Sequence, residues 1–140
     1  MKQAFVSSRV STQWHQRLNQ RIARVCRSHG LRPFLPQVEL EGIEDAVGIL
    51  EGNEAGVVAS SLLIVVFDRP GAGVAMELAQ ALTLGVPVIG FRSGPGRRAH
   101  LGMMLEGAFA RLPSHRQVQT MAELDVALAR FVDEQEAAAR

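Results

Sequence analysis

Two short apolar runs limit most strongly what this chain can fold into. Residues 62–67 read LLIVVF and residues 86–91 read VPVIGF, and neither run alternates apolar with polar residues. Strands that are covered on both faces, as in a parallel sheet, have this continuous apolar pattern. The segment between them follows a glycine turn and is predicted to be a helix at residues 74–84. The pattern therefore predicts a parallel sheet whose strands are joined by helices.

The remainder of the chain continues this alternation of strands and helices. Further strands are predicted at residues 4–8, 31–36 and 116–120. Further helices are predicted at residues 11–30, within 37–60, at 100–109 and from 121 to the end of the chain. The expected fold is a three-layer α/β sandwich around a five-stranded parallel sheet.

Two of the predicted helices have clear signals at their ends and along one face. Ser11 or Thr12 is the expected N-cap of the first helix, and Thr120 with Glu123 is a candidate capping box for the last. The first helix has apolar residues at helical spacing: Trp14, Leu18, Ile22 and Val25. The last helix has a similar stripe: Met121, Leu124, Leu128 and Phe131. Both helices are therefore expected to pack on the sheet.

Length and composition agree with one globular unit. A chain of 140 residues with 47% apolar residues is predicted to be a single domain, residues 1–140, with a substantial core. The formal net charge of +1 gives no large electrostatic footprint for a nucleic acid. The single cysteine, Cys26, excludes an intrachain disulfide, and the 4 histidines are too widely spaced to suggest a metal site. No cofactor is expected.

No segment has the character of a membrane span or a targeting signal. The longest apolar run, residues 62–67, is far too short to cross a bilayer. The first residues lack the basic and apolar regions of a secretory signal peptide. We therefore expect a soluble, cytoplasmic protein whose partners are small molecules, with neither a membrane nor a nucleic acid polymer among them.

The carboxyl edge of the predicted sheet is the expected place for a ligand. Three loops meet there: residues 7–12, 67–73 and 92–98. The second contains the turn DRPGAG, in which Gly71 and Gly73 allow conformations and close approaches that a Cβ would block. The helix that follows offers free N–H groups to a phosphate or a sugar hydroxyl. An ordinary turn is the alternative, because the dinucleotide and P-loop signatures are both absent.

Glu77 is the strongest catalytic candidate. It lies four residues after Gly73, and helical side chains lean toward the N-terminus of their helix, so its carboxylate can reach the space above the turn. The helix dipole is expected to keep it ionised, which is the state that a nucleophile requires. The alternative is a surface glutamate that the dipole favours. Its apolar neighbours Met76, Leu78 and Ala79 argue against that alternative.

Other polar side chains are expected at the same edge. Asp68 ends a predicted strand; it could bind a sugar hydroxyl or pass a proton to a leaving base, or it could simply cap the turn. Five arginines fall on the edge loops and could pair with a phosphate: Arg9, Arg69, Arg92, Arg97 and Arg98. Solvated surface arginines are the alternative.

The motifs at this edge resemble those of the nucleoside 2-deoxyribosyltransferase family. The resemblance runs from FVSS at residues 5–8 through GLRPFLPQ at 30–37 to LLIVVFDRPGAGVAMELAQALTLGVPVIG at 62–90. Residues 98–109 look more like the related 2′-deoxynucleoside 5′-phosphate N-hydrolases. The resemblance implies a flavodoxin-like, Rossmann-like sandwich. It also implies a homo-oligomer in which a neighbouring subunit contributes to each site.

The resemblance further implies roles for individual residues. Glu77 would be the nucleophile that attacks C1′ of a deoxyribosyl group, and the glycosyl group would pass to another base or to water. Gly71 and Gly73 would border the sugar or phosphate. The first loop, with Ser7, Ser8 and Arg9, would line the opposite wall. Independently of the resemblance, Arg98 is the edge-loop arginine that we expect to bind a 5′-phosphate.

The sequence departs from the family pattern at several positions. Phe5 stands nearest to the expected tyrosine of the first strand, Gly71 replaces an aspartate and Val74 replaces a threonine. Gly102 stands closest to a serine that touches phosphate in the hydrolases, although GVAME at residues 73–77 favours that branch. Because these polar groups are missing, a non-catalytic nucleoside- or nucleotide-binding module is the alternative to an N-glycosidase. A cytokinin-activating type of phosphoribohydrolase ranks lower, since its PGGxGTxxE signature is absent.

Overall fold

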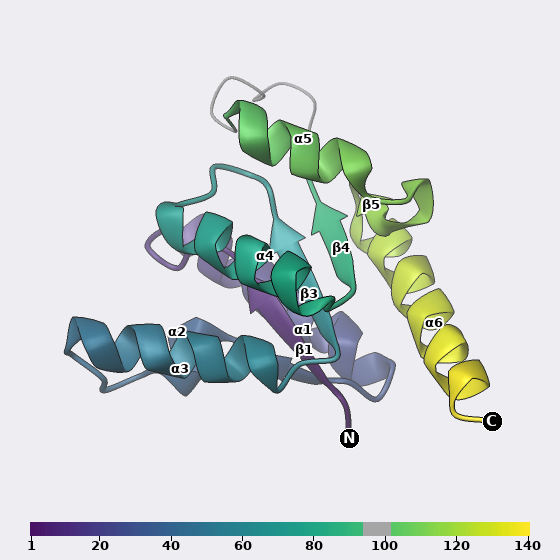
Figure 1. The fold of residues 1–140 in the computed structure, drawn as a ribbon, viewed down its shortest axis with the longest axis horizontal. Helices are drawn as coiled ribbons and strands as arrows, with labels where there is room; N and C mark the ends of the chain where they lie inside the picture. The colour runs from purple at the N-terminus through teal and green to yellow at the C-terminus, as the bar shows by residue number, and fades with distance from the viewer. Residues whose placement is uncertain (94–101) are drawn as a thin grey trace.

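The computed structural model describes residues 1–93 and 102–140 and contains one five-stranded sheet. The strand order is β2-β1-β3-β4-β5, and all neighbouring strands are parallel. The strands are β1 (Gln3–Ser7), β2 (Arg32–Phe34), β3 (Leu62–Val66), β4 (Val88–Phe91) and β5 (Gln117–Val118). The predicted sheet is therefore confirmed, with the strands of the two apolar runs, β3 and β4, paired with each other (Figure 1).

Helices cover both faces of the sheet. The long helices are α1 (Gln13–Ser28), α3 (Ala46–Val58), α4 (Ala72–Leu84), α5 (Met103–Arg111) and α6 (Met121–Ala138). Two shorter helices are α2 (Pro36–Glu39) and the 3₁₀ helix Ser114–Arg116. α1 and α6 pack on one face, and α3, α4 and α5 pack on the other (Figure 1). This arrangement is the predicted three-layer α/β sandwich of the Rossmann-like kind.

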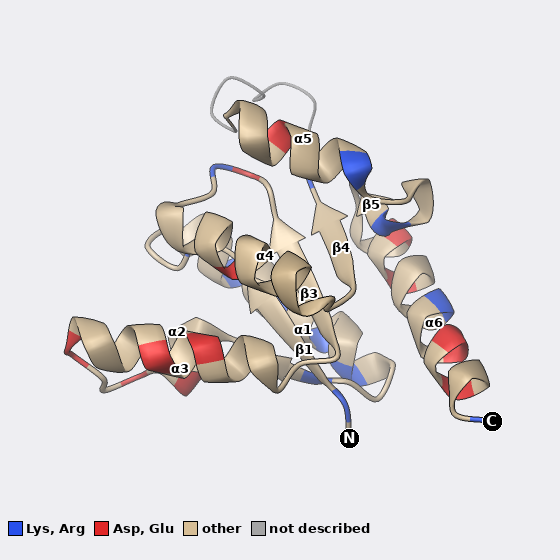
Figure 2. Cartoon of the chain, in the orientation of Figure 1, with Lys and Arg blue, Asp and Glu red and all other residues tan. Residues whose placement is uncertain are grey.

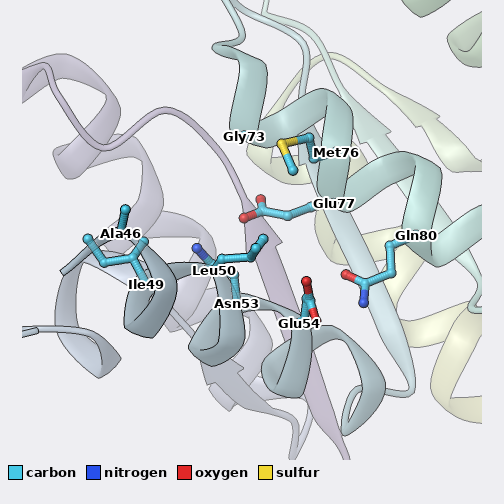
Figure 3. A pocket seen from close by; sticks show the side chains of 9 residues that line it. All are labelled: Ala46, Ile49, Leu50, Asn53, Glu54, Gly73, Met76, Glu77 and Gln80. Carbon is cyan, nitrogen blue, oxygen red and sulfur yellow. The ribbon is translucent and has the colours of Figure 1, made fainter.

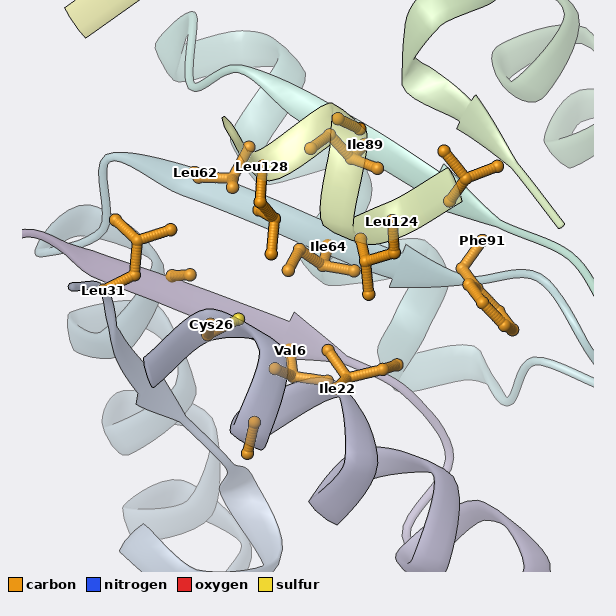
Figure 4. Close-up of a cluster of buried hydrophobic side chains, with 14 of the residues drawn as sticks. Val6, Ile22, Cys26, Leu31, Leu62, Ile64, Ile89, Phe91, Leu124 and Leu128 are labelled. Carbon is orange, nitrogen blue, oxygen red and sulfur yellow. The ribbon is translucent and has the colours of Figure 1, made fainter. Parts of the chain in front are cut away.

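The residues of β3 alternate between two apolar cores. Leu62 and Ile64 belong to the cluster under α1 and α6, together with Leu128 (Figure 4). Leu63 and Val65 belong to the cluster under α3 and α4. These four residues and Val66, the fifth of β3, are all completely buried. A strand with apolar cores on both sides needs no polar alternation, which accounts for the continuous apolar run.

The segment at residues 37–60 is more structured than its sequence suggests. One helix was expected there, whereas the structure has the short α2, with Pro36 in its first turn, followed by α3. Met103 begins α5, so the helix predicted at 100–109 is observed from that residue onward. Residues 94–101 lie outside the described part of the chain.

The buried face of α1 is partly polar. Thr12 is its N-cap, which confirms one of the two residues predicted for this position, Ser11 and Thr12. Trp14 was expected on the buried stripe, but it is 50% exposed. The neighbouring His15 and also Asn19 are buried instead, each 2% exposed. The predicted buried stripe is therefore wrong by one residue at the start of the helix. The prediction placed Trp14 on the same face as Leu18 and Ile22 because it is large and apolar, whereas His15 occupies that face.

Residues 1–93 and 102–140 contain neither a membrane-spanning helix nor a metal-ligand cluster. None of their helices combines the length and the apolar character that a bilayer requires. In the same part of the chain, no three His, Cys, Asp or Glu side chains lie close enough together to hold a metal ion.

Candidate active site

Glu77 reaches from α4 to the end of β1. α4 buries Val74, Leu78 and Ala81 against the sheet, so residue 77 lies at the margin of the buried stripe. Its Oε1 accepts a hydrogen bond of 2.7 Å from the hydroxyl of Ser7, the last residue of β1. Ser7 is completely buried. The bond holds the carboxylate at the carboxyl edge of the sheet, where a ligand was expected.

Burial changes the ionisation of Glu77. It raises the pKa of the carboxyl group from its ordinary value of 4.5 to about 7, and the hydrogen bond from Ser7 opposes the shift only in part. The expectation that the helix dipole keeps Glu77 ionised is therefore wrong. The dipole acts mainly within the first turn of a helix, and Glu77 lies beyond the first turn after the N-cap, Gly71.

A pocket of about 440 Å³ lies between α3 and α4, and Glu77 forms part of its wall. The volume is within the range of small-molecule sites. On the α4 side, Met76 and Gln80 flank Glu77, and on the α3 side Leu50 and Asn53 face them (Figure 3). Apolar and amide side chains thus surround two carboxylates, Glu77 and the exposed Glu54 of α3. Such a wall suits a ligand with a flat apolar body and a polar edge.

The two glycines before Glu77 leave open space. Neither uses the left-handed conformation that favours glycine, so the predicted conformational role is wrong. Among the described residues, a Cβ at Gly73 would meet no atom within 4 Å, and one at Gly71 would meet only the Nε of Arg9, at 4.0 Å. Gly73 lines the pocket beside Glu77. The free space at this glycine therefore lies where a ligand would approach the carboxylate.

The turn after β3 is held from two sides at Asp68. Its carboxylate accepts hydrogen bonds from the backbone N–H of Ser93, at 3.0 Å, and from the Ser93 hydroxyl, at 2.8 Å. Its carbonyl oxygen lies 2.7 Å from Nε2 of His15. Asp68 is not among the residues that line the described pocket. The structure thus gives it contacts within the fold, and proton transfer by Asp68 stays a prediction.

Arg69 is the residue of this turn that adopts a left-handed backbone, with φ 47°. For a residue other than glycine this conformation costs about 1 kcal/mol or more. The cost is tolerated where the surrounding structure fixes the chain, and Asp68, with its bonds to two other elements, directly precedes Arg69. Sequence reasoning had assigned the unusual backbone of the turn to its glycines.

Arg9 lies over the glycine turn. Its Nε is the nearest atom to the site of a Cβ on Gly71, and its side chain is half-buried. The carbonyl of Arg9 accepts hydrogen bonds from Asn19 Nδ2, at 3.3 Å, and from the hydroxyl of Ser8, at 3.4 Å. Ser8 therefore directs its hydroxyl to the backbone of the next residue. Arg9 brings a positive charge close to the N-terminus of α4, where an anion would bind.

Arg92 is committed to α5 rather than to a ligand. It is buried, pairs with Glu106 at 3.1 Å and lies 4.3 Å from the ring centroid of Phe109. These contacts tie α5 to the end of β4, so the side chain is not free for a phosphate. Arg97 and Arg98 lie outside the described residues, and a phosphate contact by Arg98 stays a prediction.

Three residues near the site were missed by sequence reasoning. His15 lies three residues before Leu18, so helical spacing could have placed it on the buried stripe of α1. Gln80 lies three residues after Glu77, on the same side of α4, and could have been found in the same way. Asn53 offered no such signal, because the apolar residues of α3 are spread around the helix and do not define one buried face.

Comparison with known families gives one match. The sequence pattern of the family described as nucleoside 2-deoxyribosyltransferase matches residues 5–112, which extend from β1 to the residue after α5. The matched segment includes Glu77, its partner Ser7 and the residues that line the pocket. Comparison with curated protein sequences gives no match.

Solved structures share the fold at low sequence identity. A conserved protein from Enterococcus faecalis V583 aligns with a TM-score of 0.74 and 19% identity, over 93% of this chain and 98% of that one. A 2-desoxiribosyltransferase from Leishmania mexicana aligns with a TM-score of 0.66 and 16% identity, over 95% and 98% of the two chains. For the 2-deoxyribosyltransferase of Bacillus psychrosaccharolyticus the TM-score is 0.61 and the identity 17%, over 76% and 81%.

Proposed function

Because this chain belongs to the nucleoside 2-deoxyribosyltransferase family, we propose that it cleaves the N-glycosidic bond of a deoxynucleoside or its 5′-monophosphate, with Glu77 as nucleophile. One observation carries the proposal. The Glu77 carboxylate lies in the wall of a pocket large enough for a nucleoside, and a buried hydroxyl holds one of its oxygens. The other oxygen, Oε2, accepts no hydrogen bond from the described residues and is available to attack.

The proposed reaction has two steps. In the first, a Glu77 oxygen attacks C1′, the C1′–N bond breaks, and the base leaves with the bonding electrons and takes up a proton. In the second, a new base or a water molecule attacks C1′ and gives up a proton to a general base, and the Glu77 carboxylate is released. Asp68 remains the candidate for proton transfer to the base, and its carboxylate accepts from Ser93 in the structure.

Ser7 supports a catalytic site over a non-catalytic module. The resemblance led us to expect a tyrosine hydroxyl on the first strand beside Glu77, and the chain has no tyrosine. The hydroxyl of Ser7 comes from that same strand and donates to Glu77 at 2.7 Å. We therefore assign to Ser7 the role expected of the tyrosine, which is to orient the Glu77 carboxylate. No comparable observation favours the binding module.

The pocket suggests how a nucleoside would lie. The apolar side chains of Leu50 and Met76 offer a surface for the base, and the amide of Asn53 offers a donor and an acceptor for its edge. The open side of Gly73 leaves room for the sugar beside Glu77. A 5′-phosphate would fall toward the N-terminus of α4, near Arg9.

A cytoplasmic homo-oligomer forms part of the proposal. Several large apolar side chains on α3 and α4 are exposed in the single chain: Val47, Leu50, Val58, Met76, Leu82 and Leu84. Two of them, Leu50 and Met76, also line the pocket. Apolar surface of this kind next to a site favours a subunit contact there, in agreement with the homo-oligomer that the family resemblance implies.

Release of free base is the experiment that tests the proposed function. Purified protein is incubated with the four deoxynucleosides and their 5′-monophosphates, with and without a second free base, and the products are separated by liquid chromatography. We expect release from at least one substrate. Product that carries the second base identifies transfer, and free sugar identifies hydrolysis.

Two variants complete this experiment. Glu77→Gln keeps the shape of the side chain but cannot act as a carboxylate, and we expect it to release no base. Glu51→Gln changes an exposed carboxylate of α3 that does not line the pocket, and we expect normal release. Ligand binding without release in the wild-type protein, seen as a thermal shift, would favour the non-catalytic module instead.

A further inference from the structure

His15 is a buried polar residue at the start of α1 to which the proposed chemistry gives no part. It is 2% exposed. Its Nδ1 lies 2.6 Å from Oγ1 of Thr12, the N-cap of α1, and its Nε2 lies 2.7 Å from the carbonyl oxygen of Asp68. The ring therefore connects the N-terminus of a helix with the end of a central strand.

These two contacts define where the ring carries its proton. A carbonyl oxygen can only accept, so Nε2 of His15 holds a hydrogen and donates it to Asp68. Oγ1 of Thr12 already accepts from the backbone N–H of His15, at 3.1 Å, which leaves its own hydrogen free for donation to Nδ1. The ring thus satisfies both neighbours and is held in one orientation.

The carbonyl that His15 holds belongs to a strained turn. The next residue, Arg69, has the left-handed φ of 47°. A non-glycine residue keeps such a conformation only where its surroundings over-determine it. His15 fixes the turn from the α1 side, and Ser93 fixes it from the end of β4 through the Asp68 carboxylate. The path of the chain out of β3 therefore depends on these two partners.

The same turn leads directly into the helix of the nucleophile. α4 begins at Ala72 with Gly71 as its N-cap, so residues 68–71 set the place of its first turns. Ser7 fixes one oxygen of Glu77 but not the helix itself. Displacement of a reacting group by about 1 Å can lower turnover about a hundredfold. Small movements of this turn therefore affect the reaction much more than the fold.

We propose that His15 is a positioning residue for the glycosidic reaction. Through the carbonyl of Asp68 it holds residues 68–71, and through them α4, so that Glu77 lies where it can attack C1′. The inference rests on the proposed function, because His15 is given no chemistry of its own. His15 is not among the residues that line the described pocket, so its effect passes through the turn.

Three variants test this inference on the full-length protein. His15→Leu removes the donor to Asp68, whereas His15→Gln keeps an N–H at about the reach of Nε2. His29→Leu is the matched control: it removes a histidine from the far end of α1, where Nε2 lies 2.7 Å from Asp125. If His15→Leu does not fold, His15→Asn takes its place, because its shorter side chain leaves the Asp68 carbonyl unpaired.

Steady-state kinetics on folded protein give the first readout. For His15→Leu we expect kcat to fall about 10- to 100-fold while KM changes less than about threefold, since misplacement affects the transition state more than binding. His15→Gln should recover most of the lost kcat, and His29→Leu should behave as the wild-type protein. A role in stability alone would lower the melting temperature and leave kcat per folded molecule unchanged, which would overturn the inference.

Hydrogen exchange at the amides of residue 69 and residues 71–75 separates this inference from the proposed function. We expect faster exchange in His15→Leu than in the wild-type protein, and near wild-type exchange in His15→Gln and His29→Leu. If the wild-type protein releases no base, the proposed function fails, and the exchange then tests the link between His15 and the turn by itself. Unchanged exchange in a folded His15→Leu protein would contradict that link.

Discussion

The two faces of the sheet differ in how tightly their helices pack and in how much apolar surface these helices leave exposed. Under α1 and α6, here called the closed face, the apolar core includes completely buried residues of both sheet and helix, such as Ile64 and Leu128. The hollow of about 410 Å³ on this side lies between α6 and residues 114–118, and its one carboxylate, Glu123, is exposed. On the other face, α3 and α4 leave a pocket between them and expose large apolar side chains such as Val58 and Leu82. The first face holds the fold together, and the second carries the candidate chemistry.

Charge follows the same division. Most acidic and basic residues belong to helices, and strands β1, β3 and β4 contain none (Figure 2). Two charged residues are turned inward. Arg92 is buried against α5, whereas Glu77 bonds to Ser7 of β1, and burial raises its pKa to about 7. A pKa raised by burial means that ionisation of this carboxyl group lowers the stability of the folded protein. Its presence on the open face is better explained by a reaction than by packing. Variants on the two faces should therefore have opposite effects.

The largest effect is expected for Glu77→Gln. Loss of the carboxylate should lower kcat/KM by roughly 10⁴-fold or more, because the nucleophile is removed. The melting temperature should not fall, since the amide keeps the size of the side chain and an oxygen that accepts from Ser7. Chromatographic base release and calorimetry on the same samples measure both quantities. Activity close to that of the wild-type protein would remove Glu77 from the mechanism.

The reverse pattern is expected for Leu128→Ala on the closed face. Leu128 is completely buried in the core under α1 and α6, so truncation should lower the free energy of unfolding by about 2–5 kcal/mol. The kcat per folded molecule should remain near that of the wild-type protein. Urea denaturation gives the first quantity, and assays at low temperature give the second. A large loss of kcat in folded protein would mean that the two faces are not separable.

Ser7→Ala should change the pH dependence of the reaction. The reactive form is the carboxylate, so kcat/KM should fall as the pH drops through the pKa of Glu77, about 7. The hydrogen bond from Ser7 lowers that pKa, and its removal should raise the pKa further and move the acidic limb to higher pH. Ser8→Ala, whose hydroxyl meets only the Arg9 carbonyl among the described residues, should leave the limb near pH 7.

The smallest effect is expected for Gly73→Ala. A Cβ at this position meets none of the described atoms, and alanine is favoured over glycine within a helix by about 0.5–1 kcal/mol, so stability should rise slightly. The same methyl group would enter the pocket beside Glu77 and should raise KM. Gly85→Ala is the contrasting variant, because φ 73° at the C-cap of α4 is strained for alanine and stability should fall. An unchanged KM in Gly73→Ala would show that the substrate lies elsewhere.

The sequence predicted the closed face better than the open one. The runs in β3 and β4 and the stripe of α6 are repeated local patterns, and these define which residues are buried. α3 has apolar residues on all sides, so no periodicity showed which of them, such as Asn53, would face a pocket. The sequence placed Glu77 and Ser7 at the same edge of the sheet but not in contact.

The features that were missed depend on contacts between distant residues. The hydrogen bond from Ser7 to Glu77 joins positions separated by 70 residues, and the raised pKa follows from burial that only the packed fold creates. From the sequence alone, His15 resembles a polar surface residue. Its role becomes visible only in the fold, where its two ring nitrogens contact Thr12 and Asp68. Local patterns carry no information on such pairs.

Mass spectrometry of the glycosyl-enzyme tests the central claim most directly. Wild-type protein is mixed with a deoxynucleoside that it cleaves, quenched with acid within one turnover, digested and analysed. The account predicts a deoxyribosyl group attached to the peptide that contains Glu77, and none on that peptide in Glu77→Gln. Base release with the adduct on another residue would contradict the account.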